Sequence, residues 1–168
     1  MNIREALLAE HSKKQTVKIV RHLGSDVGRF AELMSVFFAG PYRVTQRAAW
    51  PVSYCIEEHP ELAGPYIGRL NSLLESPDRH DAVRRNVARL RQLVEIPSRL
   101  RCRTYEACYS LVDKPQQPIA VRVFAMTVAA KAAEGHPDLV RELELVIKKY
   151  FEDGSAGFKA RIRKILKG

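Results

Sequence analysis

The chain has 168 residues, of which 46% are hydrophobic and 28% are charged. This length suits one domain, in which folding buries roughly 70% of the surface that the unfolded chain exposes, and the composition excludes a disordered or fibrous protein. Lysine and arginine number 28 against 19 acidic residues, and the resulting net charge of +9 favours an acidic partner: nucleic acid, an acidic protein surface or an anionic membrane.

Apolar residues recur along the chain at the spacing of an amphipathic helix, as in the run Leu139, Leu143, Val146, Ile147 and Tyr150. No segment alternates apolar and polar residues strictly enough to predict a strand. In chain order we therefore expect helices at residues 2–10, 12–23, 26–39, 41–58, 60–75, 80–95, 98–113, 118–134, 137–151 and 156–167.

Capping and turn residues mark the ends of these predicted helices. Ser12 with Gln15 forms a capping box, and Ser155 can cap the last helix. Breaks are predicted at Gly24-Ser25, His59-Pro60, Ser76-Pro77-Asp78, Ile96-Pro97, the stretch from 115 to 118, His136-Pro137 and Asp153-Gly154. Pro51 and Pro65 lie inside predicted helices, where we expect a kink or a shifted boundary.

The sequence also repeats. His59-Pro60-Glu61-Leu62 recurs as His136-Pro137-Asp138-Leu139, two units of about 38 residues later. A second series, Val44, Val83, Val121 and Phe158, opens every other helix at intervals of about 37–39 residues. A fixed period of this size predicts a stack of helix pairs in which each pair buries its apolar side against its neighbours.

Paired helices of this length, with an apolar–Arg step opening the second helix as in Val83-Arg84 and Val121-Arg122, resemble HEAT repeats. The resemblance implies an all-α fold, a right-handed α-α superhelix (a HEAT-like solenoid) of four to five antiparallel pairs whose second helices line a concave side. We expect residues 1–168 to form one domain, with 1–24 as irregular capping helices and 25–168 as repeats. Thr45 stands where the repeat pattern has a basic residue.

The segment from Tyr42 to Trp50 is similar to small bacterial HEAT-like proteins whose function is not settled. Trp50 with Arg43, Arg47 and Arg89 also resembles, distantly, the groove of the HEAT-like alkylation-repair DNA glycosylases. Those enzymes use an essential aspartate, but Tyr54 stands one turn beyond Trp50 and the chain has no second tryptophan. We therefore expect no glycosylase activity.

If the second helices line a groove, the sides of these helices opposite their core residues are candidate binding surfaces. On the helix at 41–58 that side carries Arg43, Arg47, Trp50 and Tyr54. Aromatic and cationic side chains together suit stacking on a base or anchoring a partner's side chain. The alternative is that Trp50 fills the seam between neighbouring repeats.

The helix at 80–95 continues this surface with Arg85 and Arg89, and with Arg84 and Arg91 on its flanks. Arginine suits bidentate contacts to phosphate or carboxylate, although these side chains can instead pair with glutamates of an adjacent helix. The repeat period aligns Trp50, Arg89, Thr127 and Lys164 in one row, beside a second row of Arg47, Asn86, Phe124 and Arg161. The candidate partner-binding residues are therefore Arg43, Arg47, Trp50, Tyr54, Arg85, Arg89 and Lys164.

Catalytic signatures are absent from the sequence. It has no Gly-rich phosphate loop, no Gly-x-Ser-x-Gly and no His-Glu-x-x-His, and His59 and His136 are typical of helix-ending turns. We expect no catalytic residue, no metal and no cofactor. Cys55, Cys102 and Cys108 are sparse and odd in number, which is typical of reduced thiols in a cytoplasmic protein.

The sequence thus predicts a non-enzymatic binding or scaffold module that holds a macromolecular partner on a basic, partly aromatic concave surface. A protein or peptide partner is favoured. The alternative is a nucleic-acid-binding protein that contacts phosphates through Arg84, Arg85, Arg89 and the basic C-terminal helix. No stretch approaches 18 apolar residues and no signal-peptide core is present, so we expect no membrane association. The oligomeric state is left open.

Overall fold

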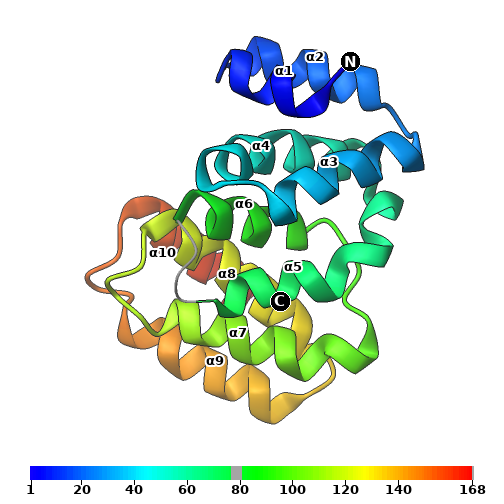
Figure 1. Ribbon diagram of the computed structural model, residues 1–168. Coiled ribbons are helices and arrows are strands. Elements are labelled where there is room, and N and C mark those ends of the chain that lie inside the picture. The colour runs from blue at the N-terminus through cyan, green and yellow to red at the C-terminus, as the bar shows by residue number, and fades with distance from the viewer. Residues whose placement is uncertain (77–80, 168) are drawn as a thin grey trace.

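A computed structural model describes residues 1–76 and 81–167 (Figure 1). This part of the chain is helical and contains no strand. The α-helices are α1 (Ile3–Ala9), α2 (Lys13–Leu23), α3 (Val27–Ala39), α4 (Tyr42–Glu58), α5 (Ile67–Glu75), α6 (Asp81–Arg91), α7 (Arg101–Val112), α8 (Ile119–Ala133), α9 (Pro137–Lys149) and α10 (Ala156–Leu166). Two 3₁₀ helices, η1 (Pro60–Tyr66) and η2 (Ser98–Leu100), precede α5 and α7.

Consecutive helices pack as pairs, and the pairs stack from α1–α2 at one end to α9–α10 at the other (Figure 1). The second helices form one continuous layer, in which α4 packs on α2 and α6, and α8 packs on α6 and α10. On the opposite side, α7 contacts both α5 and α9. This is an α-solenoid, as the repeat period predicts. The handedness of its superhelix stays a prediction.

The helix ends follow from the residues beside them. Asn2, Ser12, Asp26 and Ser155 each occupy an N-cap, where the side-chain oxygen accepts a hydrogen bond from a backbone N–H of the first turn. These caps satisfy donors that the helix cannot pair internally. The capping box predicted at Ser12 is present in part, because the Ser12 hydroxyl accepts from the backbone N–H of Gln15 at 3.1 Å.

The repeating series occupies equivalent buried positions. Val44, Val83, Val121 and Phe158 each lie in the first turn of a second helix and are at most 2% exposed. They belong to one continuous core that runs through all five pairs of the described chain. The period read from the sequence is therefore confirmed as the period of the stack.

Three predicted helices differ from the structure. One of them, expected at 98–113, divides into η2 and α7. The segment expected as one helix at 60–75 divides into η1 and α5, because Pro65 has no N–H to donate and prevents a regular α-helix before Tyr66. Pro51, in contrast, does not end α4, which continues to Glu58. The helix expected at 80–95 ends at Arg91, and its predicted first residue, like part of the predicted break at 76–78, lies outside the described residues.

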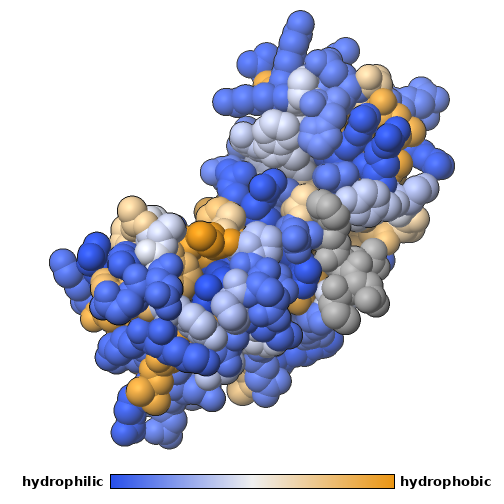
Figure 2. Space-filling view, turned by 90° about the vertical axis from the view of Figure 1, so that its left-hand side faces the viewer, coloured by the Kyte–Doolittle hydropathy of each residue, from blue (hydrophilic) through white to orange (hydrophobic). Residues whose placement is uncertain are grey.

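The face in Figure 2 is largely hydrophilic, with hydrophobic side chains in small separate groups. Among residues 1–76 and 81–167, no helix combines the length and the apolar run needed to cross a bilayer.

Candidate partner-binding groove

The helix α4 turns its only tryptophan away from the core. Val44, Ala48 and Val52 are buried on one side of α4, and Trp50 lies half-buried on another. Trp50 is therefore not enclosed between repeats, and part of its indole remains accessible. Tyr54, one turn further along α4, is also half-buried.

Trp50 opens onto a cavity of about 480 Å³, which we call the N-proximal cavity. Four segments far apart in the sequence contribute to it: the connection between α1 and α2, and the helices α4, α6 and α8. Its walls are formed by His11, Gln46, Trp50, Ala82, Arg85, Asn86, Arg89, Ala120 and Phe124. Three residues of the predicted set, Trp50, Arg85 and Arg89, thus meet in one place, and none of these lining residues is acidic.

A chain of ring and charge contacts connects this cavity to Tyr54, which does not itself line it. The ring of Trp50 lies 5.9 Å from that of His11 and 6.2 Å from that of Tyr54, measured between centroids. The Arg89 guanidinium carbon lies 5.5 Å from the centre of the Tyr54 ring, within reach of a cation–π contact. Arg89 also pairs with Glu57, at 2.6 Å between Nη2 and Oε2.

Arg85, unlike Arg89, forms no ion pair with a carboxylate of the described residues. It is exposed, and no ion pair or hydrogen bond joins it to another described residue. Its neighbour Arg84 is instead paired with Asp81 at 2.8 Å and is largely covered. Arg85 is therefore the side chain in the cavity whose positive charge is free for an external anion.

Arg43 and Arg47 do not line the cavity. Arg47 is half-buried and donates from Nη1 to the carbonyl oxygens of Leu7 and Leu8, at 3.0 and 2.9 Å, at the end of α1. Arg43, one turn earlier on α4, is exposed. The structure thus gives Arg47 a contact within the stack, between the first pair and α4, that sequence spacing did not indicate.

Lys164 lies in a second cavity of about 480 Å³, the C-proximal cavity, between α8, α9 and α10. Its lining is Thr127, Ala130, Lys131, Glu134, Val140, Leu143, Glu144, Arg161, Lys164 and Ile165. Arg161 Nη1 donates to Thr127 Oγ1 at 3.1 Å, and Lys131 Nζ donates to the Val94 carbonyl at 2.9 Å. The two predicted rows therefore divide between the cavities, with Thr127, Arg161 and Lys164 in this one.

Two features of the structure were missed by sequence reasoning: an exposed histidine beside the cavity and a buried arginine. His11 reaches the N-proximal cavity from a connection between helices, so no helical spacing points to it. Arg91, expected on the exposed flank of α6, is instead 0% exposed. Burial lowers the pKa of its guanidinium below the usual value, and burial likewise raises the pKa of the nearby Cys108 thiol to about 12.

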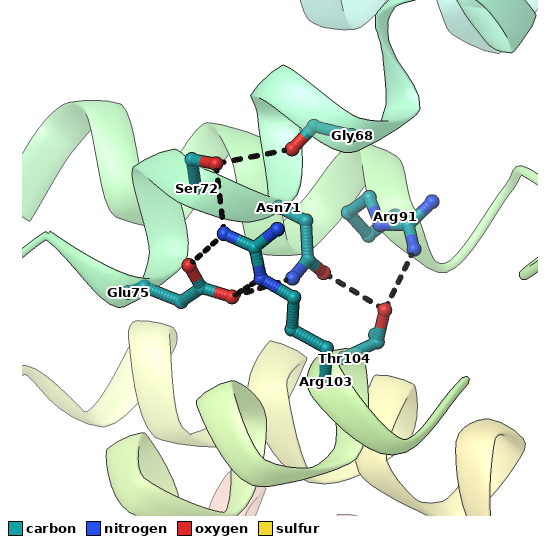
Figure 3. Close-up of polar contacts among 7 residues, drawn as sticks. All are labelled: Gly68, Asn71, Ser72, Glu75, Arg91, Arg103 and Thr104. Atoms are coloured by element: carbon teal, nitrogen blue, oxygen red, sulfur yellow. Dashed lines mark hydrogen bonds and ion pairs between the residues drawn. The ribbon is translucent and has the colours of Figure 1, made fainter. Parts of the chain in front are cut away.

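Arg91 ends a chain of polar contacts that joins α5, α6 and α7 (Figure 3). Its Nη2 donates to Thr104 Oγ1 at 3.3 Å, and that hydroxyl donates to Asn71 Oδ1 at 2.8 Å. Asn71 in turn donates to Glu75 Oε1, which Arg103 holds at 2.6 Å. The Nε and Nη1 atoms of Arg91 have no hydrogen-bond partner among the described residues.

Within the described residues, no three His, Cys, Asp or Glu side chains gather in a way that could hold a metal ion. The N-proximal cavity presents the Arg85 guanidinium, which pairs with no described residue, together with Trp50 and Phe124.

A family model described as a HEAT repeat domain matches residues 3–168. No curated protein matches the chain, and no solved structure matches it.

Proposed function

The chain belongs to the HEAT repeat family, and from this premise we propose that it is a non-enzymatic binding module that holds a protein or peptide partner along α4, α6 and α8. One observation carries the proposal. The N-proximal cavity gathers an accessible Trp50, an unpaired Arg85 and the apolar Phe124 from three different helices. Tryptophan and arginine are among the residues that most often dominate binding energy at protein interfaces.

Nucleic-acid binding is the second candidate, favoured by the net charge and by exposed cations such as Arg85, Arg163 and Lys164. Ion pairs on α6 argue against nucleic-acid binding. Two of the three α6 arginines expected to contact phosphates, Arg84 and Arg89, are already neutralised by Asp81 and Glu57. A phosphate backbone lying across the groove would have to compete with these carboxylates.

The three cysteines are unpaired thiols, which supports a protein of a reducing compartment, and we place it in the cytoplasm.

Affinity capture with quantitative mass spectrometry tests the proposal. The baits are the parent protein, the double variant Trp50→Ala/Arg85→Ala, and the control Arg99→Ala, which removes an exposed charge outside both cavities. We expect a set of proteins that the parent and Arg99→Ala recover and that the double variant loses at least tenfold, while all three baits melt at similar temperatures.

Nuclease and salt separate the two candidates. Protein capture should survive nuclease treatment and fall little between 50 and about 200 mM salt, because few counterions are released. If nuclease abolishes the capture of partners, and capture also falls steeply over that salt range, the groove binds nucleic acid instead. If the double variant captures the same proteins as the parent, the groove is not the binding site.

A further inference from the structure

The two cavities lie along one side of a single helix. Ala120 and Phe124 of α8 line the N-proximal cavity, and Thr127 and Lys131 line the C-proximal cavity. These positions follow the i, i+4, i+7, i+11 pattern of one helix face. The opposite side of α8, which includes Val121, Ala125 and other residues of 0% exposure, faces the core.

The separation of the cavities follows from helix geometry. The midpoints of the two pairs of α8 residues are seven positions apart, which at a rise of about 1.5 Å per residue is roughly 10 Å. An extended peptide advances about 3.3 Å per residue, so about three or four residues of peptide cover that distance. A short extended segment that lies along α8 is therefore long enough to reach from one pair of lining residues to the other.

The cavities differ in chemistry. The N-proximal cavity has no acidic wall, and Arg85 in it is unpaired, so it suits a carboxylate. Trp50 and Phe124 line the same cavity, so they can contact the apolar part of a side chain whose carboxylate pairs with the exposed Arg85.

The C-proximal cavity offers apolar walls instead. Leu143 is buried, Ile165 is partly buried and Val140 is 38% exposed, so all three can contact an inserted aliphatic side chain.

Acidic residues in the C-proximal cavity favour a peptide over a nucleic acid. Glu134 and Glu144 line it together with Lys131, Arg161 and Lys164, so a phosphate placed there would meet two carboxylates as well as three cations. An uncharged side chain meets no such repulsion.

We propose that the groove binds an extended acidic peptide that places a carboxylate on Arg85 and, about three or four residues away, an aliphatic side chain in the C-proximal cavity. This inference rests on the proposed function and specifies its partner.

A phage-displayed library of random twelve-residue peptides tests it. The library is selected on the full chain after counter-selection on Trp50→Ala/Arg85→Glu, so that peptides bound elsewhere are removed. We expect the enriched sequences to share an acidic residue and a Leu, Ile or Val at a spacing of about three or four. The fluorescence of Trp50, the only tryptophan of the chain, then reports binding of the corresponding synthetic peptides.

Two variants test the two cavities separately. Arg85→Glu should weaken binding of the synthetic peptide at least tenfold, and replacing the peptide's acidic residue by lysine should restore it. Val140→Glu should also weaken binding at least tenfold, because it places a charge in the apolar wall. Its control is Val27→Glu on α3, at a position that is 68% exposed and lines neither cavity.

The contrary outcomes are distinguishable. Groove-dependent peptides that lack the spaced pair, or that ignore Val140→Glu, would overturn the two-cavity inference and leave the proposed function standing. If no peptide survives counter-selection, both the inference and a peptide-binding groove are overturned. An oligonucleotide of twenty thymidines that binds more tightly than the peptides at 150 mM salt, and is lost in Arg85→Glu, would replace the peptide with nucleic acid.

Discussion

Arg91 is a charged residue that the sequence places on a flank of α6 and that the structure buries. It is the last residue of α6 and fully buried, and two of its guanidinium nitrogens have no hydrogen-bond partner among the described residues. Its one hydrogen bond, to Thr104, is long at 3.3 Å. A buried charge without a carboxylate partner is costly, because desolvation is not repaid by an ion pair.

We therefore expect Arg91→Met to stabilise the protein. Methionine keeps much of the length of the side chain and removes the uncompensated charge, while Thr104 retains its bond to Asn71. The free energy of unfolding should rise by about 1–2 kcal/mol, which for a chain of this size raises Tm by about 2–8 °C. Thermal unfolding followed by circular dichroism measures this.

Arg99→Met, at an exposed position, is the control and should stay within about 0.5 kcal/mol of the parent. A lower Tm for Arg91→Met would mean that the guanidinium stabilises the end of α6 by more than its burial costs.

At the scale of elements, the short helix α1 depends on a side chain of α4. Arg47 donates to the carbonyls of Leu7 and Leu8, which lie at the end of α1, where a helix leaves its last carbonyl groups unpaired. Seven residues of helix have little stability of their own, so tertiary contacts hold α1 in place.

Arg47→Ala should loosen α1 without disturbing the rest of the stack. Loss of the charge-assisted hydrogen bonds should cost about 1–3 kcal/mol. Hydrogen exchange of the amides in residues 3–9 should accelerate, while that of α6 and α8 stays unchanged. Arg43→Ala, an exposed position one turn away on α4, is the matched control. Equal exchange rates in the two variants would show that α1 is held by its apolar residues alone.

At the scale of the whole molecule, the stack has a centre and two ends. The helix α6 packs against α4, α5 and α8, whereas α10 has neighbours on one side only, α8 and α9. In such an array each pair stabilises the next, so a defect at the centre affects both halves and a defect at the end stays local.

Leu90 in α6 and Ile162 in α10 allow this to be tested, because both are at most 1% exposed. Leu90→Ala should cost about 2–5 kcal/mol and raise amide exchange throughout the described helices. Ile162→Ala removes a similar buried volume but should accelerate exchange mainly in α9 and α10. Mass spectrometry of exchanged peptides distinguishes the two patterns, and identical global destabilisation would show that the chain unfolds as one cooperative unit.

The helices were predictable because their signals are local. Apolar spacing, caps such as Ser12, and the His-Pro breaks at His59 and His136 act within one or two turns, so the sequence alone indicates where most helices begin and end. The repeat period adds the stacking of the pairs. The division of the predicted helix 60–75 also has a local cause, because Pro65 lacks the N–H that a regular α-helix would use.

The site was only partly predictable, because it depends on contacts between distant residues. Spacing placed Trp50, Arg85 and Arg89 on exposed sides of their helices, and these three do line one cavity. Spacing could not show that Arg89 pairs with Glu57, that Arg47 turns to α1, or that His11 completes the cavity wall. The sequence by itself determined the helices and their period, because both arise from short-range geometry. The tertiary structure decided which charges remain free, because the ion pairs and hydrogen bonds of an arginine are chosen by what packs beside it.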